Sequence, residues 1–202
     1  MNYLAIDTCG TALTVAVSYN GTTKVHYAPD CGVKHSVDLM PAVEDMLLQT
    51  GFDLNDADFI AVVVGAGSFT GIRIGVSTVK ALCFAYKKPC LAITSFDTLA
   101  YNNTNGKTLA VIDAKHGSFY ACGYTDGKVS FEPSFISRTQ LDELLSEYTP
   151  VSGLPITGLD TKVVSVTDGL IKAVESKAME KTFNLDDITP LYIRKSQAEE
   201  NR

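Results

Sequence analysis

The sequence predicts an α/β fold made of two β-β-β-α lobes, with residues 1–104 in the first lobe and residues 105–202 in the second. Short β-rich runs separated by turn residues open the chain, and the same order returns in the second half. The first run of each half ends in an aspartate, Asp7 and Asp113, followed by a tight polar turn. This repeated order, with no flexible linker between the halves, is the basis of the prediction.

Five runs rich in β-branched and apolar residues predict the strands of the first half. They are Tyr3–Asp7, Leu13–Ser18, Thr23–Ala28, Phe59–Val64 and Cys90–Thr94. The sequence Tyr19-Asn20-Gly21-Thr22 predicts a hairpin turn between the second and third of these strands.

Two segments of the first half predict helices, because their apolar residues recur at helical spacing. The first runs from His35 to Gln49, with Pro41 expected in its first turn and Gly51 as its left-handed cap. The second runs from about Gly71 to Tyr86. Ser95 is expected to cap a short helical turn further along.

The second half predicts four strands and two helices. The strands are Thr108–Asp113, Ser118–Tyr124, Lys128–Ser137 and Val151–Ile156. Thr139, followed three residues later by Asp142, marks the start of a helix that reaches about Tyr148. The other helix is expected from Thr167 to Met179.

Composition narrows the possible functions. The net charge of −6 argues against a protein that holds a nucleic acid backbone by itself, because that task needs a basic patch. No apolar run reaches the roughly 18 residues of a membrane helix, and the N-terminus lacks signal-peptide features, so a cytoplasmic location is expected. The five cysteines form no close pair, which favours reduced thiols over disulfides or a zinc cluster.

A glycine-rich segment lies between a predicted buried strand and a predicted helix. It is Gly65-Ala66-Gly67-Ser68-Phe69-Thr70-Gly71-Ile72-Arg73-Ile74-Gly75. Ser68 and Thr70 can cap the helix, and free N–H groups at its start suit an anion. Glycines also permit close approach of another backbone, so the segment is either an anion site or a packing device. Its spacing fits neither a Walker loop nor the dinucleotide-binding fingerprint.

The two repeated units, each with an acidic strand end and a hairpin of small residues, resemble the actin-like (ribonuclease H-like) superfamily of actin, chaperone ATPases and sugar kinases. In that superfamily the hairpin amides face nucleotide phosphates, and the aspartates hold a metal-bound water. The resemblance therefore implies residues that face a nucleotide or phosphate. These are Asp7, Thr8, Gly67, Ser68, Thr70, Gly71 and Asp113.

Four motifs, in order along the chain, resemble the TsaB (YeaZ) family. They are His35-Ser36-x-x-Leu39-Met40-Pro41, Gly65-x-Gly67-Ser68-Phe69-Thr70-Gly71-x-Arg73-x-Gly75, Asp113-Ala114 and Tyr192-Ile193-Arg194-Lys195-x-Gln197-Ala198-Glu199. The resemblance implies an actin-like protein that works with the transferase TsaD and the ATPase TsaE to make threonylcarbamoyladenosine in tRNA. It also implies a homodimer in isolation, and contact with tRNA only through the complex. An older label of the family is glycoprotease.

TsaD-type proteins carry a metal-binding HxxxH pair at positions that the resemblance aligns with Ser95 and Leu99. Leucine cannot bind a metal, and serine is a poor replacement for imidazole. The chain is therefore expected to have no catalytic residue, no metal site and no tightly bound cofactor, with ATP and metal belonging to the partner subunits. The same argument disfavours metallopeptidase activity.

The two helices of the first half carry more apolar residues than one contact with a sheet requires. The resemblance implies that family members dimerise and bind TsaD through these helices. The residues expected at the partner interface are His35, Met40, Val43, Met46, Leu47, Arg73, Val76, Val79 and Lys80. The alternative is that the apolar ones form core, that His35 is a hydrogen-bonded cap and that Arg73 is an internal ion-pair partner.

Two other functions stay open as alternatives. One is a small actin-like ATPase or kinase that uses Asp7 and Asp113 around magnesium, and it requires nucleotide binding by the isolated chain. The other is a free-standing RNA-binding module, which conflicts with the acidic balance of the chain.

Overall fold

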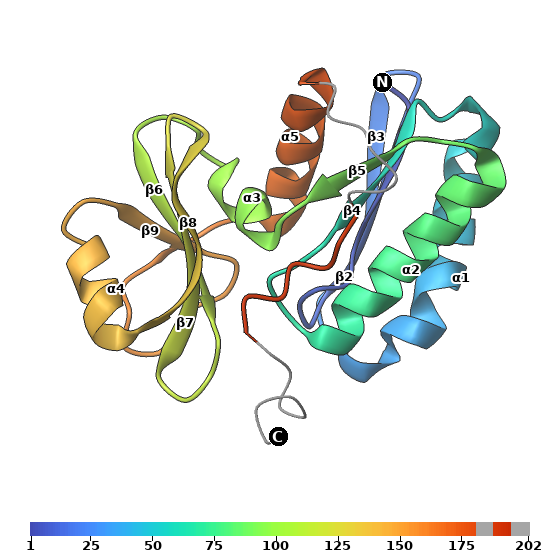
Figure 1. Ribbon diagram of the computed structural model, residues 1–202. Coiled ribbons are helices and arrows are strands. Elements are labelled where there is room, and N and C mark those ends of the chain that lie inside the picture. The colour runs from blue at the N-terminus through green and yellow to red at the C-terminus, as the bar shows by residue number, and fades with distance from the viewer. Residues whose placement is uncertain (181–187, 195–202) are drawn as a thin grey trace. The chain divides into compact units, whose positions relative to one another are not determined.

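The computed structural model of the chain describes residues 1–180 and 188–194. They form two compact units, each built on a five-stranded sheet (Figure 1). Unit 1 comprises Met1–Thr94 and Val174–Leu191, and unit 2 comprises Ser95–Ala173 and the segment that begins at Tyr192. Among the described residues, no helix has both the length and the apolar character that crossing a membrane demands.

The sheet of unit 1 is mixed, with the strand order β3-β2-β1-β4-β5. Its strands are β1 (Tyr3–Asp7), β2 (Leu13–Tyr19), β3 (Thr22–Ala28), β4 (Phe59–Val63) and β5 (Cys90–Ile93). In the central strand β1, Ile6 lies opposite Val15 of antiparallel β2 and opposite Val62 of parallel β4. Every residue of β4 is buried, as expected for an apolar central strand covered on both faces.

Two helices, α1 (His35–Thr50) and α2 (Phe69–Tyr86), lie side by side on one face of this sheet (Figure 1). The 3₁₀ helices η1 (Gly32–Lys34) and η2 (Leu54–Asp56) precede α1 and β4. Gly51 ends α1 with a φ of 63°, which confirms the predicted left-handed cap. Pro41 lies in the second turn of α1 and not in the first, because the helix already begins at His35.

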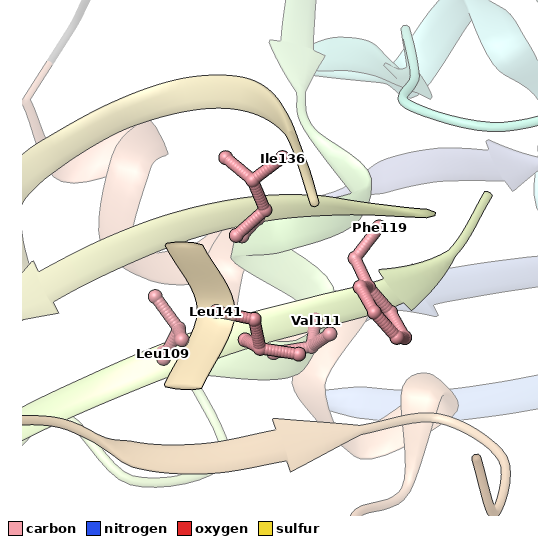
Figure 2. Packing of buried hydrophobic residues seen from close by; sticks show 6 residues of the cluster. Leu109, Val111, Phe119, Ile136 and Leu141 are labelled. Atoms are coloured by element: carbon pink, nitrogen blue, oxygen red, sulfur yellow. The ribbon is translucent and has the colours of Figure 1, made fainter. Parts of the chain in front are cut away.

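The sheet of unit 2 has the order β10-β9-β6-β7-β8. Its strands are β6 (Lys107–Asp113), β7 (Ser118–Thr125), β8 (Lys128–Ser137), β9 (Thr149–Ser152) and β10 (Lys162–Val163), and the helices that follow β5 are α3 (Ser95–Ala100), α4 (Arg138–Leu144) and α5 (Val166–Met179). Figure 2 shows the core on the α4 side of this sheet. It consists of Leu109, Val111, Phe119, Ala121, Ile136 and Leu141.

The two sheets follow one plan, since each unit places its first strand in the centre, its second and third strands on one side, and its fourth and fifth on the other. The detail at the first strand end is repeated as well. Asp7 Oδ1 accepts a hydrogen bond from the N–H of Cys9, and Asp113 Oδ1 accepts one from the N–H of Lys115, both at 2.8 Å. The structure confirms the predicted α/β class and shows that the two halves of the chain repeat one strand plan.

The start of α4 differs from the sequence prediction. Ser137 caps this helix, and the Gln140 side chain accepts a hydrogen bond from the Ser137 N–H to complete a capping box. Thr139 and Asp142, the predicted capping pair, lie inside the helix. Asp142 instead accepts a hydrogen bond from Arg138 Nε at 2.8 Å, one helical turn earlier.

The two units divide the chain differently from the predicted lobes 1–104 and 105–202. Helix α3 follows a strand of unit 1 in the sequence, but it packs on β6 and belongs to unit 2. Helix α5 is shared, with Val166–Ala173 in unit 2 and Val174–Met179 in unit 1. A helix belongs to the unit whose sheet it contacts. The order of the elements along the sequence does not show which sheet that is, so the predicted boundary differs from the observed one.

Candidate functional site

The glycine-rich segment forms the turn from β4 into α2 in unit 1. Ser68 is the N-cap of α2, and its Oγ accepts a hydrogen bond of 3.3 Å from the N–H of Gly71. The N–H of Ser68 donates to the carbonyl of Cys9 at 2.8 Å. Two N–H groups that could have bound an anion at the start of α2 are therefore already used within the protein.

The glycines of this segment lie against the turn that follows β1. A Cβ on Gly67 would overlap the carbonyl oxygen of Cys9, and a Cβ on Gly71 would overlap the carbonyl oxygen of Thr8. A Cβ on Gly75 would lie 2.5 Å from the Thr8 hydroxyl oxygen. Since the chain's own backbone occupies these spaces, Gly67 and Gly71 are needed for packing, and a contact of either residue with a phosphate stays a prediction.

Thr8 takes part in the same packing. Its side chain is buried, and its hydroxyl donates a hydrogen bond of 2.6 Å to the carbonyl of Gly71. This bond ties the turn after β1 to α2 and leaves Thr8 turned into the protein. Ser68 and Thr70 are exposed, and a contact between either of them and a nucleotide stays a prediction.

A segment from the C-terminal part of the chain completes this region of unit 1. The N–H of Leu191 donates to the carbonyl of Val64 at 2.7 Å. The Leu191 carbonyl oxygen lies 2.7 Å from the place of a Cβ on Gly65, so this glycine too is required by the chain's own backbone. Sequence reasoning missed this contact, and the one available signal was the family motif that begins directly afterwards, at Tyr192.

The two strand-end aspartates have different surroundings. Burial raises the pKa of the Asp7 carboxyl above its ordinary value, while the hydrogen bond from Cys9 and the charge of His35 act in the opposite direction. Asp113 is exposed and forms a salt bridge of 3.3 Å with Lys115. Exposed pairs of this kind contribute little to stability. A joint role of Asp7 and Asp113 around a metal-bound nucleotide stays a prediction.

The outer sides of α1 and α2 expose large apolar side chains. We call this region the partner surface and define it by Val37, Met40 and Leu48 of α1 and Phe84 of α2. Leu48 and Phe84 are the most exposed of the four, at 82% and 85%. A single exposed apolar residue is common, but four on two helices that contact each other favour an interaction site.

Five of the nine residues predicted at the partner interface are instead buried. They are His35, Val43, Met46, Val76 and Val79. Val43 and Met46 are only 1% and 3% exposed, because the apolar stripe of an amphipathic helix turns towards the sheet it covers. The prediction of these five as contact residues is therefore wrong for the folded chain. Those that reach solvent are Met40, Arg73 and Lys80, with Leu47 partly exposed.

His35 connects the start of α1 to two neighbouring segments. Its Nδ1 contacts the carbonyl of Gly32, and its Nε2 lies 3.1 Å from the carbonyl oxygen of Ala12. The N–H of Gly32 also donates to the carbonyl of Thr11 at 2.8 Å. The structure thus supports the alternative reading of His35 as a hydrogen-bonded residue that holds α1 against the turn after β1.

The charges beside the partner surface have opposite signs on its two helices. Acidic side chains of α1 reach solvent at Glu44 and Asp45, while α2 exposes Arg73 and Lys80. The Arg73 guanidinium lies 5.8 Å from the centre of the Phe69 ring, at the start of the same helix. Both helices therefore expose apolar side chains, together with acidic side chains on α1 and basic side chains on α2.

Ser95 and Leu99, which the resemblance aligns with the metal-binding histidines of TsaD-type proteins, are both buried in α3. Leu99 lies in the packed interior of unit 2. Ser95 is the first residue of α3, and its Oγ has no hydrogen-bond partner among the described residues, so the prediction that Ser95 caps this helix is wrong. Within residues 1–180 and 188–194, no three His, Cys, Asp or Glu side chains are placed to hold a metal ion.

The last of the four family motifs is described as far as Arg194. Its guanidinium lies 5.0 Å from the centre of the Phe135 ring in unit 2. The remaining part of the motif, residues 195–199, lies outside the described residues.

Comparison with known proteins places this geometry in context. Residues 28–147 match the family model described as TsaD: tRNA N6-adenosine threonylcarbamoyltransferase. The chain is 28% identical to the tRNA threonylcarbamoyladenosine biosynthesis protein TsaB of Escherichia coli (strain K12), over 98% of this chain and 96% of that protein. It is 36% identical to the protein of the same description in Bacillus subtilis (strain 168), over 59% of this chain and only 53% of that relative.

Solved structures show the same fold. The structure of YeaZ from Pseudomonas aeruginosa superimposes with a TM-score of 0.76 and 24% identity, covering 95% of this chain and 99% of that one. An uncharacterized protein with similarity to peptidase YEAZ, also from Pseudomonas aeruginosa, gives a TM-score of 0.77 at 24% identity, covering 96% and 99%.

Proposed function

We propose a function from the premise that the chain belongs to the TsaB (YeaZ) family and so takes part in tRNA threonylcarbamoyladenosine biosynthesis. In this proposal it is a cytoplasmic, non-catalytic subunit that binds and supports a TsaD-type transferase, with a TsaE-type ATPase as the third partner. The observation that carries the proposal is the exposed apolar partner surface on α1 and α2.

The composition of the partner surface supports a specific protein contact. Its apolar side chains can be removed from water, which is the main favourable term in association. The acidic side chains of α1 and the basic side chains of α2 suit a two-fold arrangement in which α1 of one copy meets α2 of another. Such an arrangement would make the isolated chain a homodimer. A transferase that uses the same surface would compete with this homodimer, because one apolar patch cannot bind both at once.

The geometry near the glycine-rich segment favours a non-catalytic role of this chain over ATP hydrolysis by the chain itself. In an autonomous actin-like ATPase, the backbone beside Gly67 and Gly71 would have to approach phosphates, but these positions are packed against Thr8 and Cys9. At the metal-binding positions of TsaD-type proteins this chain carries the side chains of Ser95 and Leu99. We therefore assign ATP and metal to the partner subunits.

The proposal is tested by placing a charge on the partner surface with Leu48→Glu and Phe84→Glu. Both side chains are exposed, so the variants should fold, as checked by circular dichroism. We expect the variants to be monomeric in sedimentation equilibrium. With the TsaD-type transferase, the TsaE-type ATPase and tRNA of the same organism, we expect at least a tenfold loss of threonylcarbamoyladenosine formation.

The matched control is Leu154→Glu, which changes an exposed leucine of unit 2 that is 63% exposed. We expect this variant to associate and to support the modification like the unchanged chain. If Leu48→Glu and Phe84→Glu still dimerise and still support the modification, the partner surface is not the interface and the proposal is wrong.

A further inference from the structure

Two aromatic rings lie next to each other on the sheet of unit 2, on the face opposite α4. Tyr120 of β7 pairs with Phe135 of β8, and their ring centres are 5.7 Å apart at an interplanar angle of 55°. Phe119 and Ile136, their neighbours in the two strands, belong to the core on the α4 side (Figure 2). Because side chains alternate along a strand, Tyr120 and Phe135 lie on the other face.

A guanidinium extends this aromatic pair. Arg194 lies over the Phe135 ring at 5.0 Å, and Phe135 itself is 38% exposed. Arg194 belongs to the family motif that starts at Tyr192, and the proposed function assigns no task to this motif. A planar guanidinium over a half-exposed ring offers a flat, cationic surface of the kind that stacks on nucleobases.

The end of the sheet beside this pair carries further hydrogen-bond donors. The hairpin that leads into β7 exposes Lys115 and His116, only a few residues before Tyr120. The one carboxylate of this hairpin, Asp113, already binds the Lys115 side chain and its N–H. The Lys115 ammonium and the N–H of the His116 ring can donate hydrogen bonds to a phosphate group.

We propose that Tyr120, Phe135 and Arg194 form a stacking platform for an unpaired base of single-stranded RNA, with Lys115 and His116 of the hairpin beside its phosphates. The platform is too small and the chain too acidic to hold a whole RNA alone, so it orients a loop of an RNA that a partner also binds. The inference goes beyond the proposed function, and only the choice of tRNA as the RNA rests on that function.

Two experiments test the platform. In the first, the full chain in complex with the TsaD-type transferase is irradiated with a tRNA transcript that contains 4-thiouridine, and crosslinked peptides are identified by mass spectrometry. We expect crosslinks within residues 118–137 or 188–194. In the second, binding of a fluorescein-labelled adenosine decamer by the full chain is measured by anisotropy at low salt.

The anisotropy experiment compares Phe135→Ala, Arg194→Ala and Arg194→Lys with the control Val129→Ala, an exposed apolar residue at the other end of β8. We expect about tenfold weaker binding for the first two, because each loses a stacking partner. Arg194→Lys should also bind the decamer weakly, because lysine keeps the positive charge but lacks the planar guanidinium that stacks on a base. Val129→Ala should bind like the unchanged chain.

Several results would overturn the platform. These are no decamer binding by the unchanged chain, no crosslink in either segment, an equal loss with Val129→Ala, or full rescue by Arg194→Lys. A loss of transferase binding in Phe135→Ala and Arg194→Ala, with decamer binding unchanged, would instead assign the surface to a protein partner. If the chain failed to bind the transferase at all, the proposed function would fail while the decamer result would still stand.

Discussion

At Gly71, a single absent methyl group decides whether the turn after β1 can reach α2. A Cβ there would overlap the carbonyl oxygen of Thr8, and this backbone atom cannot move without disturbing β1. We expect Gly71→Ala to destabilise the protein by about 1–3 kcal/mol in urea unfolding, the usual range for overpacking. The control is Gly10→Ala, where the nearest atom to a Cβ is 3.9 Å away. Equal stability of the two variants would contradict this account.

At Asp7, the raised pKa gives stability a definite dependence on pH. The folded protein binds this proton more tightly than the unfolded chain does. The resulting stabilisation is therefore fully present below the ordinary pKa of 3.8 and is lost as the pH rises through the raised value. Asp7→Asn removes the titration but keeps an oxygen that can accept the Cys9 N–H.

We therefore expect Asp7→Asn to gain stability relative to the unchanged chain as the pH rises from 4 to 8. The measurement is guanidinium unfolding across this range, with Asp113→Asn as a control at the exposed, equivalent strand end. Parallel curves for the unchanged chain and Asp7→Asn would show that burial of this carboxyl has no net effect on stability.

At the scale of elements, the start of α4 can be assigned by comparing substitutions at Ser137 and Thr139. Ser137 supplies both halves of its capping box, since its Oγ and its N–H each bond Gln140. We expect Ser137→Ala to cost about 1 kcal/mol of stability in urea unfolding. Thr139→Ala, within the helix, should change stability by less than about 0.5 kcal/mol. A larger loss of stability in Thr139→Ala than in Ser137→Ala would mean that Thr139 caps the helix, as the sequence pattern predicted.

Most of the elements could be predicted from local patterns. β1 and β8 have the predicted bounds, and α1 and α2 differ from the prediction by one or two residues at their ends. Their signals are local, since alternation, helical spacing and glycine caps need no knowledge of the rest of the chain. β10 was missed because Lys162 and Val163 are two exposed residues that form no pattern.

The partner surface was harder to predict, because spacing identifies an apolar stripe but not the direction in which it points. Val43 and Leu48 are both apolar residues of α1, yet the first is buried against the sheet and the second is exposed. The glycine-rich segment was ambiguous for a similar reason. Whether Gly67 meets a phosphate or the carbonyl of Cys9 depends on a turn that lies more than fifty residues earlier.

At the scale of the whole molecule, the chain passes between the two units at three places, after Thr94, Ala173 and Leu191. The second passage lies within helix α5, whose first part belongs to unit 2 and whose last part belongs to unit 1. Ile188, which follows in unit 1, is buried. A loss of packing in unit 1 therefore acts on a helix that unit 2 also needs.

This connection predicts that the two units unfold together. We expect Ile188→Ala to cost about 2–5 kcal/mol, the range for deleting a buried aliphatic side chain. Circular dichroism should show one urea transition, and hydrogen exchange should rise in β1 and in β6 alike, because opening the C-terminal part of α5 frays its N-terminal part. The control Met179→Ala, an exposed residue of the same helix, should leave both unchanged. Two separate transitions, or faster exchange in β1 alone, would mean that each unit is stable without its neighbour's share of α5.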